Sequence, residues 1–291
     1  MFLVNYLYLT SKRGSSVKIG IISDLHIDNN NRRLQHDYKY APMLSQMLEA
    51  RDLDLLLIAG DISSDYKLSQ DFLKELQDLS GKSTFFVPGN HEFWQSPESS
   101  TGAHDIFNYF LKQDENLVGQ VRHLNEEWAL VGSPGWYDYG YGNHEKFSIE
   151  DFERRKYRFA HWNDKRFVDW RQSDQEVSRW MKEQLIEDLE SVKDKKIILM
   201  THIATHPRFV VPLPHKLYDY VNAFLGARSY ESLYQDYNVQ YNVMGHVHWQ
   251  QALMSQRVKH MMACLGNRKQ WVNRFDPKTE IENTLMSFHI D

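Results

Sequence analysis

The sequence has little cysteine, no long apolar run and no excess of positive charge, and each lack argues against a class of protein. Cys264 is the one cysteine among 291 residues, which excludes an internal disulfide and a metal site built from thiolates. No apolar run approaches the roughly 18 residues that span a bilayer, so we expect no membrane partner. A formal net charge of −5 disfavours a general nucleic-acid binder. A lone cysteine suits a reducing compartment, and we expect a cytoplasmic protein.

Residues 1–16 precede the first predicted strand and open with an apolar and aromatic segment. In a secretory signal the positive charges come before the apolar run, whereas here Lys12 and Arg13 follow it. We therefore interpret residues 1–16 as an N-terminal extension. Residues 17–291 show no clear linker and no internal repeat. We predict that they form a single domain with an insertion at about residues 135–171.

Strand and helix patterns alternate along the first half of the chain. Short apolar runs predict buried strands, and apolar residues spaced by three or four predict helices. The predicted strands cover residues 17–23, 53–59, 84–87, 128–132, 196–200, 239–244, 251–255, 258–263 and 284–290, and the predicted helices cover residues 40–51, 67–79 and 173–192. Ser173 and Glu176 have the spacing of a helix N-cap. Alternation of strand and helix implies parallel strands with functional loops at their carboxyl ends, so we predict an α/β fold.

Five short polar motifs each follow one of the predicted strands. In chain order they are Asp24-Leu25-His26, Gly60-Asp61, Gly89-Asn90-His91-Glu92, Thr201-His202 and Gly245-His246-Val247-His248. Each motif alone is close to chance, and a lone Gly-Asp is more often a turn than a ligand. Five of them at five strand ends are hard to attribute to coincidence. We therefore expect these side chains to converge on one edge of a sheet.

The side chains in these motifs have the composition of a metal centre. Histidine nitrogens mixed with carboxylate and amide oxygens suit Mn, Fe, Zn or Co and disfavour Ca or Mg. Residues i and i+2 of an extended chain point the same way, so we expect Asp24 and His26 to reach one ion together, and likewise His246 and His248. Two divalent ions, two aspartates and a hydroxide leave a charge of about +1, which favours an anion such as phosphate.

Taken in this order, the motifs resemble the calcineurin-like metallophosphoesterase superfamily, whose pattern is D-x-H, G-D, G-N-H-[DE], H and G-H-x-H. All of these blocks are present between Asp24 and His248. The resemblance implies a four-layer αββα sandwich of two mixed sheets with flanking helices. It also implies an enzyme that hydrolyses phosphate mono- or diesters by attack of a hydroxide held between two divalent transition-metal ions, with Mn favoured.

The resemblance further implies a role for each residue of the motifs. The first metal would take Asp24, His26, Asp61 and His248, and the second would take Asp61, Asn90, His202 and His246. Asp61 would bridge the two ions. His91 would be catalytic without binding metal, standing beside the substrate to stabilise the transition state and protonate the leaving oxygen. Glu92 stands where the pattern allows Asp or Glu, and would support the site from behind the ligands.

The insertion is rich in aromatic and basic residues, and two interpretations of it stay open. As a cap, it would present aromatic faces to an organic leaving group and cations to phosphate. As an amphipathic helix, it would bury Phe152, Phe159, Trp162 and Phe167 and leave its arginines and lysines in solvent. The second interpretation is favoured for most of these residues.

A few residues near the motifs are candidates for substrate contact. Trp136 and Tyr137 directly follow a predicted strand, and Arg208, a few residues after His202, has the chemistry to pair with phosphate. Trp94 follows the third motif and is a candidate for lining the same cavity. Cys264 lies in an apolar strand, and we expect it in the core.

We expect a small phosphorylated substrate, with the choice among monoester, diester and nucleotide left open. A nuclease or nucleotide phosphodiesterase is the alternative. The net negative charge of the chain disfavours binding of nucleic acid, whereas the basic residues of the insertion favour it. A non-catalytic metal-binding scaffold is disfavoured, because such a protein should have lost ligands and this chain keeps them all. The sequence does not indicate a protein partner.

Overall fold

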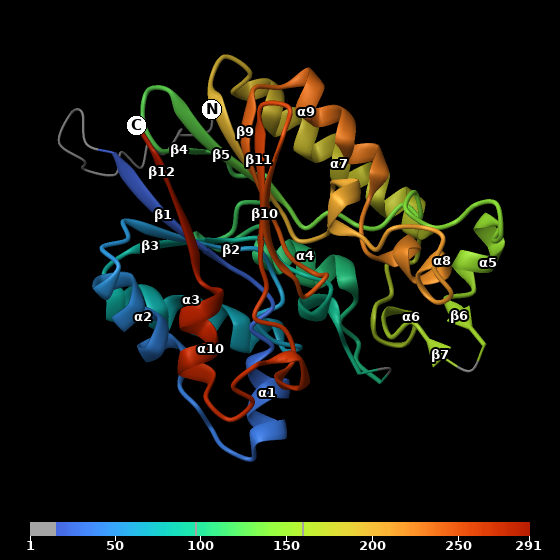
Figure 1. Ribbon diagram of the computed structural model, residues 1–291, viewed down its shortest axis with the longest axis horizontal. Helices are drawn as coiled ribbons and strands as arrows, with labels where there is room; N and C mark the ends of the chain where they lie inside the picture. The colour runs from blue at the N-terminus through green and yellow to red at the C-terminus, as the bar shows by residue number, and fades with distance from the viewer. Residues whose placement is uncertain (1–15, 97, 159) are drawn as a thin grey trace.

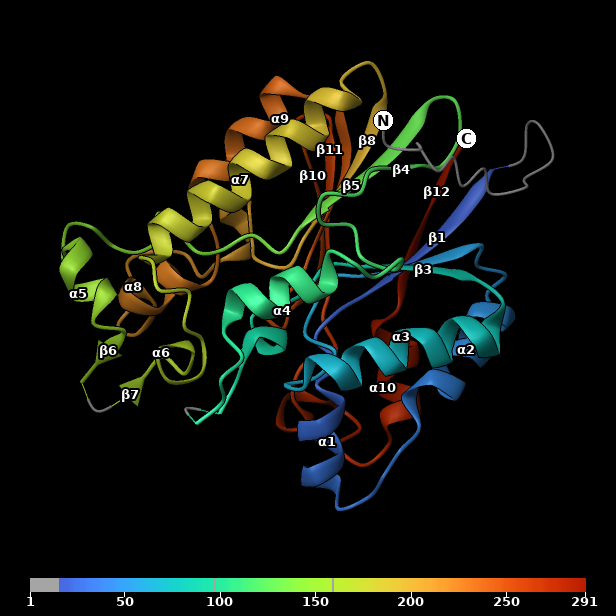
Figure 2. The ribbon, with the colours of Figure 1, turned by 180° about the vertical axis from the view of Figure 1, so that it is seen from behind.

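The computed structural model describes residues 16–96, 98–158 and 160–291. Its strands form two sheets that pack face to face, with helices on both outer faces, as Figures 1 and 2 show from opposite sides. This arrangement confirms the predicted four-layer αββα sandwich of two mixed sheets. Most of the predicted extension, residues 1–15, lies outside the described residues, as does Phe159.

The first sheet has the strand order β12-β1-β2-β3. Its strands span Val17–Ile22 (β1), Leu55–Ile58 (β2), Ser83–Phe86 (β3) and Met286–Ile290 (β12). Strands β1, β2 and β3 are parallel, and β12 is antiparallel to β1. Its outer face is covered by α2 (Tyr40–Ala50), α3 (Tyr66–Ser80) and α10 (Pro277–Thr284). Parallel strands bring their carboxyl ends to one edge, so the loops after β1, β2 and β3 lie together.

The second sheet has the strand order β10-β11-β9-β8-β5-β4. In chain order its strands span Arg122–His123 (β4), Trp128–Ser133 (β5), Lys196–Thr201 (β8), Val239–Met244 (β9), Gln250–Ser255 (β10) and Val258–Ala263 (β11). Strands β5, β8, β9 and β11 are parallel, and the two outer strands are antiparallel. Helices α7 (Asp174–Ser191) and α9 (Leu233–Asp236) cover its outer face. Ser173 caps α7 together with Glu176, as predicted.

Alternate residues of each central strand fill the layer between the sheets. Ile21 and Leu57 belong to one buried cluster with Ile198 of the facing sheet, whereas Ile22 and Ile58 face the helices. Side chains of a strand alternate between its two faces, so both faces of these strands are buried. This explains why the sequence shows continuous apolar runs here instead of alternation.

The insertion is built differently from the prediction. It contains α5 (Ile149–Glu153), the antiparallel pair β6 (Lys156–Tyr157) and β7 (Ala160–His161), and α6 (Asp164–Phe167), beside α8 (Tyr218–Val221) in Figure 1. The predicted amphipathic helix is wrong, because Arg155 and Arg158 have φ values of 47° and 56°, which a continuous right-handed helix cannot contain. Phe152 is buried and Trp162 half-buried, in line with a packing role. The extent of the insertion, 135–171, stays a prediction.

Short elements that were not predicted complete the fold. They are α1 (Ile27–Leu34), α4 (Ala103–Phe110) and the 3-10 helices η1 (His91–Phe93), η2 (Pro207–Phe209), η3 (Asn222–Phe224), η4 (Arg228–Ser232) and η5 (Arg268–Gln270). Helix α1 reads IDNNNRRL, which lacks the apolar repeat that would have predicted it. Among the described residues, no helix combines the length and the apolar composition needed to cross a membrane.

Asp174, at the start of α7, anchors the insertion to the rest of the domain. Its buried carboxylate accepts hydrogen bonds from Trp136 Nε1 at 2.7 Å and from Arg155 Nε at 2.9 Å. Tyr139 Oη and the Arg155 Nη2 atom donate to the same carboxylate. Its position at the helix N-terminus stabilises the negative charge further. The insertion is therefore tied to α7 through one buried ion pair.

We expect Asp174→Asn to lower the free energy of unfolding by about 3 kcal/mol, because removing one charge of a buried pair leaves the other uncompensated. Denaturant titration of both proteins would measure this difference. Asp169→Asn is the matched control, since the Asp169 side chain is 76% exposed and lies 4.0 Å from the Arg171 guanidinium. An amide there can still accept the hydrogen bond from the backbone N–H of Arg171, at 2.9 Å. An Asp174→Asn variant as stable as this control would contradict the anchoring role.

Candidate metal centre

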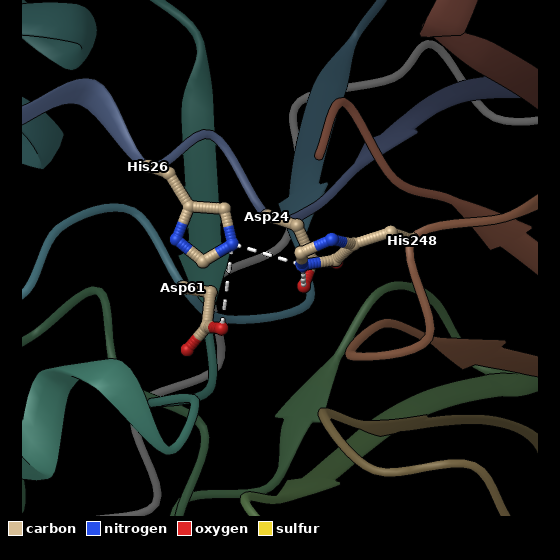
Figure 3. A group of neighbouring side chains, drawn as sticks. All are labelled: Asp24, His26, Asp61 and His248. Carbon is tan, nitrogen blue, oxygen red and sulfur yellow. Dashed lines mark hydrogen bonds and ion pairs between the residues drawn. The ribbon is translucent and has the colours of Figure 1, made fainter. Parts of the chain in front are cut away.

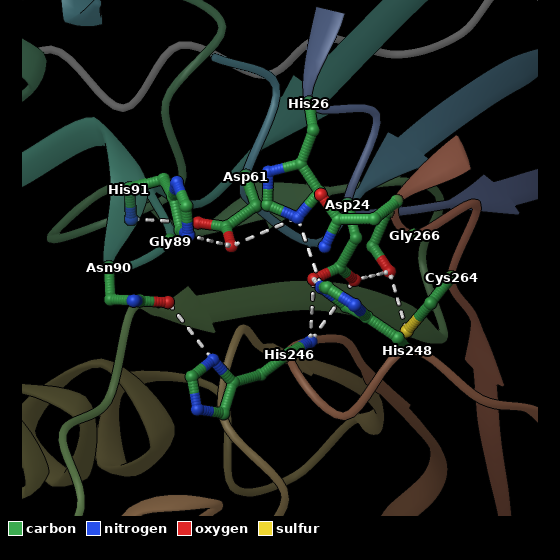
Figure 4. Close-up of polar contacts among 12 residues, drawn as sticks. Asp24, His26, Asp61, Gly89, Asn90, His91, His246, His248, Cys264 and Gly266 are labelled. Carbon is green, nitrogen blue, oxygen red and sulfur yellow. Dashed lines mark hydrogen bonds and ion pairs between the residues drawn. The ribbon is translucent and has the colours of Figure 1, made fainter. Parts of the chain in front are cut away.

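The five polar motifs meet where the parallel strands of both sheets end. Asp24, Asp61 and Asn90 follow β1, β2 and β3 of the first sheet, and His202 and His246 follow β8 and β9 of the second. The motifs therefore converge between the edges of two facing sheets, and not on the edge of one sheet as the strand pattern alone had indicated. Figure 4 shows Asp24, Asp61, Asn90 and His246, from four of the five motifs, gathered in one place.

One group of ligand-type atoms comes from Asp24, His26, Asp61 and His248 (Figure 3). The Nε2 atom of His26 lies 3.0 Å from Nε2 of His248 and 3.7 Å from Oδ2 of Asp61. The Nε2 atom of His248 lies 3.4 Å from Oδ1 of Asp24. One atom from each of the four residues lies within 4.8 Å of the others, so a single ion can contact all of them.

A second group is formed by Asp61, His202 and His246, with Asn90 beside them. The Nε2 atom of His202 lies 3.5 Å from Oδ1 of Asp61 and 3.0 Å from Oδ1 of Asn90. The Nδ1 atom of His246 lies 2.9 Å from the same Asn90 oxygen. Asp61 thus directs Oδ2 toward the first group and Oδ1 toward the second. It is the residue that the two groups share.

The backbone at these ligands is not extended. Asp24, His26, Asp61, His246 and His248 all have left-handed φ values, between 43° and 73°. The predicted explanation of the two i, i+2 pairs by an extended chain is therefore wrong: the chain turns sharply at each ligand. Such a conformation costs about 1–3 kcal/mol for each residue and recurs where a site over-determines the backbone. Asp and His are among the side chains that tolerate it best.

Two glycines make room for the ligands. Gly60 has a φ of 84°, and a Cβ atom there would lie 2.5 Å from Nδ1 of His202. A Cβ atom on Gly89 would lie 2.2 Å from Oδ1 of Asp61. Both separations are too short for real atoms, so a side chain at either position would displace a ligand.

Backbone carbonyls determine which nitrogen of His202 and of His246 faces the centre. Nδ1 of His202 lies 2.8 Å from the oxygen of Ala59, and Nε2 of His246 lies 2.9 Å from the oxygen of Phe224. A carbonyl can only accept, so these nitrogens carry the protons. Burial lowers the pKa of His202 and lowers the pKa of His246 to about 4, so both rings are neutral at pH 7.

The other nitrogens of these two rings therefore hold lone pairs. Both lone pairs face the oxygen of Asn90, which is itself an acceptor. Three acceptors that face one another without a donor between them match the environment of a bound cation. This donor set fits a metal ion.

The charges of the first group give the same indication. Burial, followed by the charge that His248 carries when protonated, lowers the pKa of His26 to about 3. Burial, followed by the nearby carboxylate of Glu92, raises the pKa of Asp61. A divalent ion would compensate the buried carboxylate of Asp61 and would bind the lone pair of the neutral His26 imidazole.

Glu92 lies behind the ligands and binds the loops that carry them. Its carboxylate accepts backbone N–H groups from Asp61 at 2.9 Å, Ile62 at 2.7 Å and Gly89 at 2.7 Å. The Ser69 hydroxyl donates to it at 2.9 Å. The loops after β2 and β3 are thus held together by one buried side chain, which agrees with the supporting position predicted for Glu92.

His91 lies beside the two groups and belongs to neither. Its Nδ1 atom lies 3.1 Å from Oγ of Ser64, and its Nε2 atom lies 4.0 Å from Oδ2 of Asp61. Its ring stacks on Trp94, with centroids 3.7 Å apart. His91 and Trp94 line a cavity of about 470 Å³ beside the centre, as predicted for Trp94. Burial lowers the pKa of His91, so the ring is neutral at pH 7.

No motif marks Asp164, a residue of α6 that contacts the centre. It is 1% exposed, and its Oδ1 atom accepts from Asn90 Nδ2 at 2.9 Å and from Trp94 Nε1 at 2.6 Å. Its Oδ2 atom accepts from Trp162 Nε1 at 2.9 Å. Because the Asn90 amide donates to Asp164, its oxygen must face His202 and His246. The insertion thereby orients a candidate metal ligand.

The structure buries two of the three predicted substrate residues. Trp136 and Tyr137 are 1% and 0% exposed and pack into the core, so the expectation that they contact substrate is corrected. Trp136 is held there by its hydrogen bond to Asp174. Arg208 lies exposed in η2 and is not part of the wall of the cavity beside His91. Cys264 is buried, as expected for a core residue.

Two curated relatives, both from Helicobacter pylori strains, are described as uncharacterised metallophosphoesterases. The first is 28% identical over 131 residues, which make up 44% of this chain and 31% of the relative. The second is 28% identical over 106 residues, or 36% of this chain and 27% of the relative. This chain therefore matches about a third of the length of these relatives.

Solved structures share the fold over nearly the whole chain. A phosphopantetheinyl hydrolase from Mycobacterium tuberculosis superposes with a TM-score of 0.70 at 17% identity, covering 94% of this chain and 96% of that one. A protein from Thermus thermophilus superposes with a TM-score of 0.52 at 12% identity, covering 94% and 99%. At the level of sequence families, residues 17–250 match the calcineurin-like phosphoesterases. The chain therefore belongs to the calcineurin-like phosphoesterase family.

Proposed function

We propose that the protein is a phosphoesterase that uses two divalent metal ions to hydrolyse small phosphate mono- or diesters. The observation that carries this proposal is the convergence of nitrogen and oxygen lone pairs on two adjacent points that share Asp61. The proposed ligands are Asp24, His26, Asp61, Asn90, His202, His246 and His248. When bound, two such ions polarise phosphoryl oxygens and activate water for attack at phosphorus.

We propose Mn²⁺ for both positions, with Fe, Zn and Co as alternatives. Imidazole mixed with carboxylate and amide oxygen suits these ions, and the acceptors available at the centre do not include a thiolate. Burial raises the pKa of the Cys264 thiol, which keeps it protonated. The low cysteine content, one buried residue in 291, supports our proposal of a cytoplasmic location.

His91 is proposed to act on the substrate directly. The Ser64 hydroxyl can donate to Nδ1 of the neutral ring, which leaves the proton on Nε2, the atom directed toward Asp61. An Nε2–H group at this place can donate to a phosphoryl oxygen or to the leaving oxygen of an ester. The His91 ring stacks on Trp94, and Trp94 in turn stacks on Phe167, with the centroids of these last two rings 4.8 Å apart. This stack holds the His91 ring in position.

Asp164 is proposed to orient Asn90 for the second ion. We expect Asp164→Asn to weaken binding of the second ion about 10- to 100-fold, the usual effect of removing a hydrogen-bond partner of a metal ligand. The reason is that an amide in place of the carboxylate can no longer accept from Asn90, Trp94 and Trp162 together. Calorimetric titration of metal-free protein with Mn²⁺ would resolve the two binding steps.

Asp169→Asn is the control for this variant, since it makes the same change in the same insertion on an exposed side chain. If both variants bind the second ion as the unmodified protein does, Asp164 does not position Asn90. A loss of both ions, together with a loss of folding, would instead assign Asp164 to the stability of the insertion.

The direct test of the proposed function is a panel of phosphate esters on protein of defined metal content. We expect Mn²⁺-loaded protein to hydrolyse p-nitrophenyl phosphate or bis-p-nitrophenyl phosphate, and chelated protein to hydrolyse neither. A phosphopantetheine diester belongs in the panel, because the structural neighbour with a TM-score of 0.70 is named for that group. Protein that holds two ions and hydrolyses none of these esters would overturn the proposal.

A nuclease or nucleotide phosphodiesterase is the second candidate. It is favoured by the exposed cations of the insertion, among them Arg154, Lys165 and Arg166. Cleavage of a short single-stranded oligonucleotide faster than of the small esters would support it. A non-catalytic scaffold remains the third, and a metal-loaded protein inactive on every ester would favour it.

A further inference from the structure

Two cavities flank the candidate metal centre, and they differ in charge. The cavity beside His91, of about 470 Å³, is lined by Arg32 and Arg33 of α1 and by Lys269 of η5. The other, of about 510 Å³, borders His248; the described residues that line it include Glu280 and no lysine or arginine. An anionic substrate held at the centre therefore meets complementary charge on the His91 side alone.

The cations of the first cavity are held in place by neutral groups. The Asn29 oxygen accepts from Arg32 Nη2 at 3.1 Å and from Arg33 Nε at 3.0 Å. The Asn29 amide in turn donates to Oδ1 of Asn267 at 2.7 Å, which ties α1 to the loop that precedes Lys269. Both guanidinium groups thus keep further N–H donors for a ligand.

These charges are not compensated by the protein nearby. Over residues 16–96, 98–158 and 160–291, neither arginine nor Lys269 forms an ion pair with a carboxylate within 4.0 Å. Among the described lining residues Asp164 is the one carboxylate, and its oxygens already accept three N–H groups. The wall of this cavity is therefore cationic, although the chain as a whole has a formal net charge of −5. Such local charge concentrates anions.

We propose that Arg32, Arg33 and Lys269 bind a second phosphate of the substrate, so that the preferred substrates are small phosphate esters whose alcohol part carries a further phosphate. This inference rests on the proposed function, because it assumes that the first phosphate lies at the metal centre. Guanidinium groups bind phosphate through paired N–H donors. A cavity of about 470 Å³ has the size of small-molecule sites, which favours a small ester over a polymer.

The test compares two chromogenic diesters that differ by one phosphate: thymidine 5′-(p-nitrophenyl phosphate) with and without a 3′-phosphate. Release of nitrophenol reports hydrolysis of the 5′-diester in both. We expect Mn²⁺-loaded protein to favour the 3′-phosphorylated diester about tenfold in kcat/KM, the effect of one charge-assisted contact. Added salt should reduce this preference.

The variant Arg32→Gln/Arg33→Gln/Lys269→Gln should lower the ratio of the two kcat/KM values to about one, because the diester with the second phosphate should lose more than the diester without it. Its control, Arg171→Gln/Arg179→Gln/Lys193→Gln, removes the same charge from exposed residues away from this cavity. We expect the control to keep the preference. An equal preference in both variants, or none in the unmodified protein, would overturn the inference.

A binding measurement separates this inference from the proposed function. Calorimetry would compare thymidine 3′,5′-bisphosphate with thymidine 5′-monophosphate on metal-loaded and metal-free protein, and on the single variant Lys269→Gln in case the triple variant does not fold. If neither diester is hydrolysed but the bisphosphate binds more tightly through these cations, the second-phosphate site stands and the proposed function fails. If the bisphosphate and the monophosphate bind with equal affinity, the assignment of the second-phosphate site is wrong. Tighter binding of a single-stranded oligonucleotide than of the bisphosphate would also overturn the small-molecule substrate.

Discussion

Asp61→Asn is expected to lower kcat/KM on bis-p-nitrophenyl phosphate by at least about a thousandfold, equivalent to about 4 kcal/mol of transition-state stabilisation. Asp61 is the one residue shared by both ligand groups, with Oδ2 at 3.7 Å from His26 and Oδ1 at 3.5 Å from His202. An amide keeps the shape of the side chain but offers a single neutral acceptor. It therefore removes the negative charge that would hold two cations close together.

Metal content measured by mass spectrometry should fall from about two ions per chain to one or fewer in this variant. Asp65→Asn is a matched control: Asp65 caps α3 four residues later, and Asn caps a helix as well as Asp does. The control should keep its metal and its activity. Full hydrolysis by Asp61→Asn would contradict the shared-ligand role.

His91→Ala is expected to lower kcat about 10²- to 10³-fold, the range for removal of a hydrogen-bond donor that stabilises charge in the transition state, while metal content stays unchanged. The separation of these two effects follows from the structure, because His91 belongs to neither ligand group and its Nε2 atom lies 4.0 Å from Asp61. KM should change less than kcat, since the contact is proposed to strengthen in the transition state.

His36→Ala makes the same change on an exposed histidine and should have no effect. Ser64→Ala should have a smaller effect than His91→Ala, because it removes only the hydrogen bond to Nδ1. Loss of metal from His91→Ala would show that His91 is a ligand after all, and an unchanged kcat would remove it from catalysis.

The candidate ligands could be identified from the sequence because each of their motifs follows a strand that an apolar run predicts. The pairing of strands into two sheets was not visible in those runs, so residues expected at one edge lie between two. The left-handed backbone at Asp24, His26 and Asp61 was not predictable either. It results from contacts between loops, such as the hydrogen bonds that the backbone N–H groups of residues 61–63 donate to the Glu92 carboxylate.

The surroundings of the centre escaped prediction because they depend on contacts distant in sequence. Asp164 orients Asn90 from 74 positions away, and neither residue carries a local signal of the other. Trp136 follows a strand end, as pocket residues often do, yet its indole N–H reaches Asp174, 38 positions later, and turns the ring into the core. Arg155 and Arg158 interrupt a segment whose composition favours a helix.

Two ions are proposed to act together, with Asp61 as the residue that both ligand groups share. Metal-free protein would be titrated with Mn²⁺ while hydrolysis of bis-p-nitrophenyl phosphate is followed. We expect activity to rise mainly with the second equivalent and to level off at about two ions per chain, as a two-metal site requires. Full activity at one equivalent, or activity that persists in excess chelator, would contradict the claim.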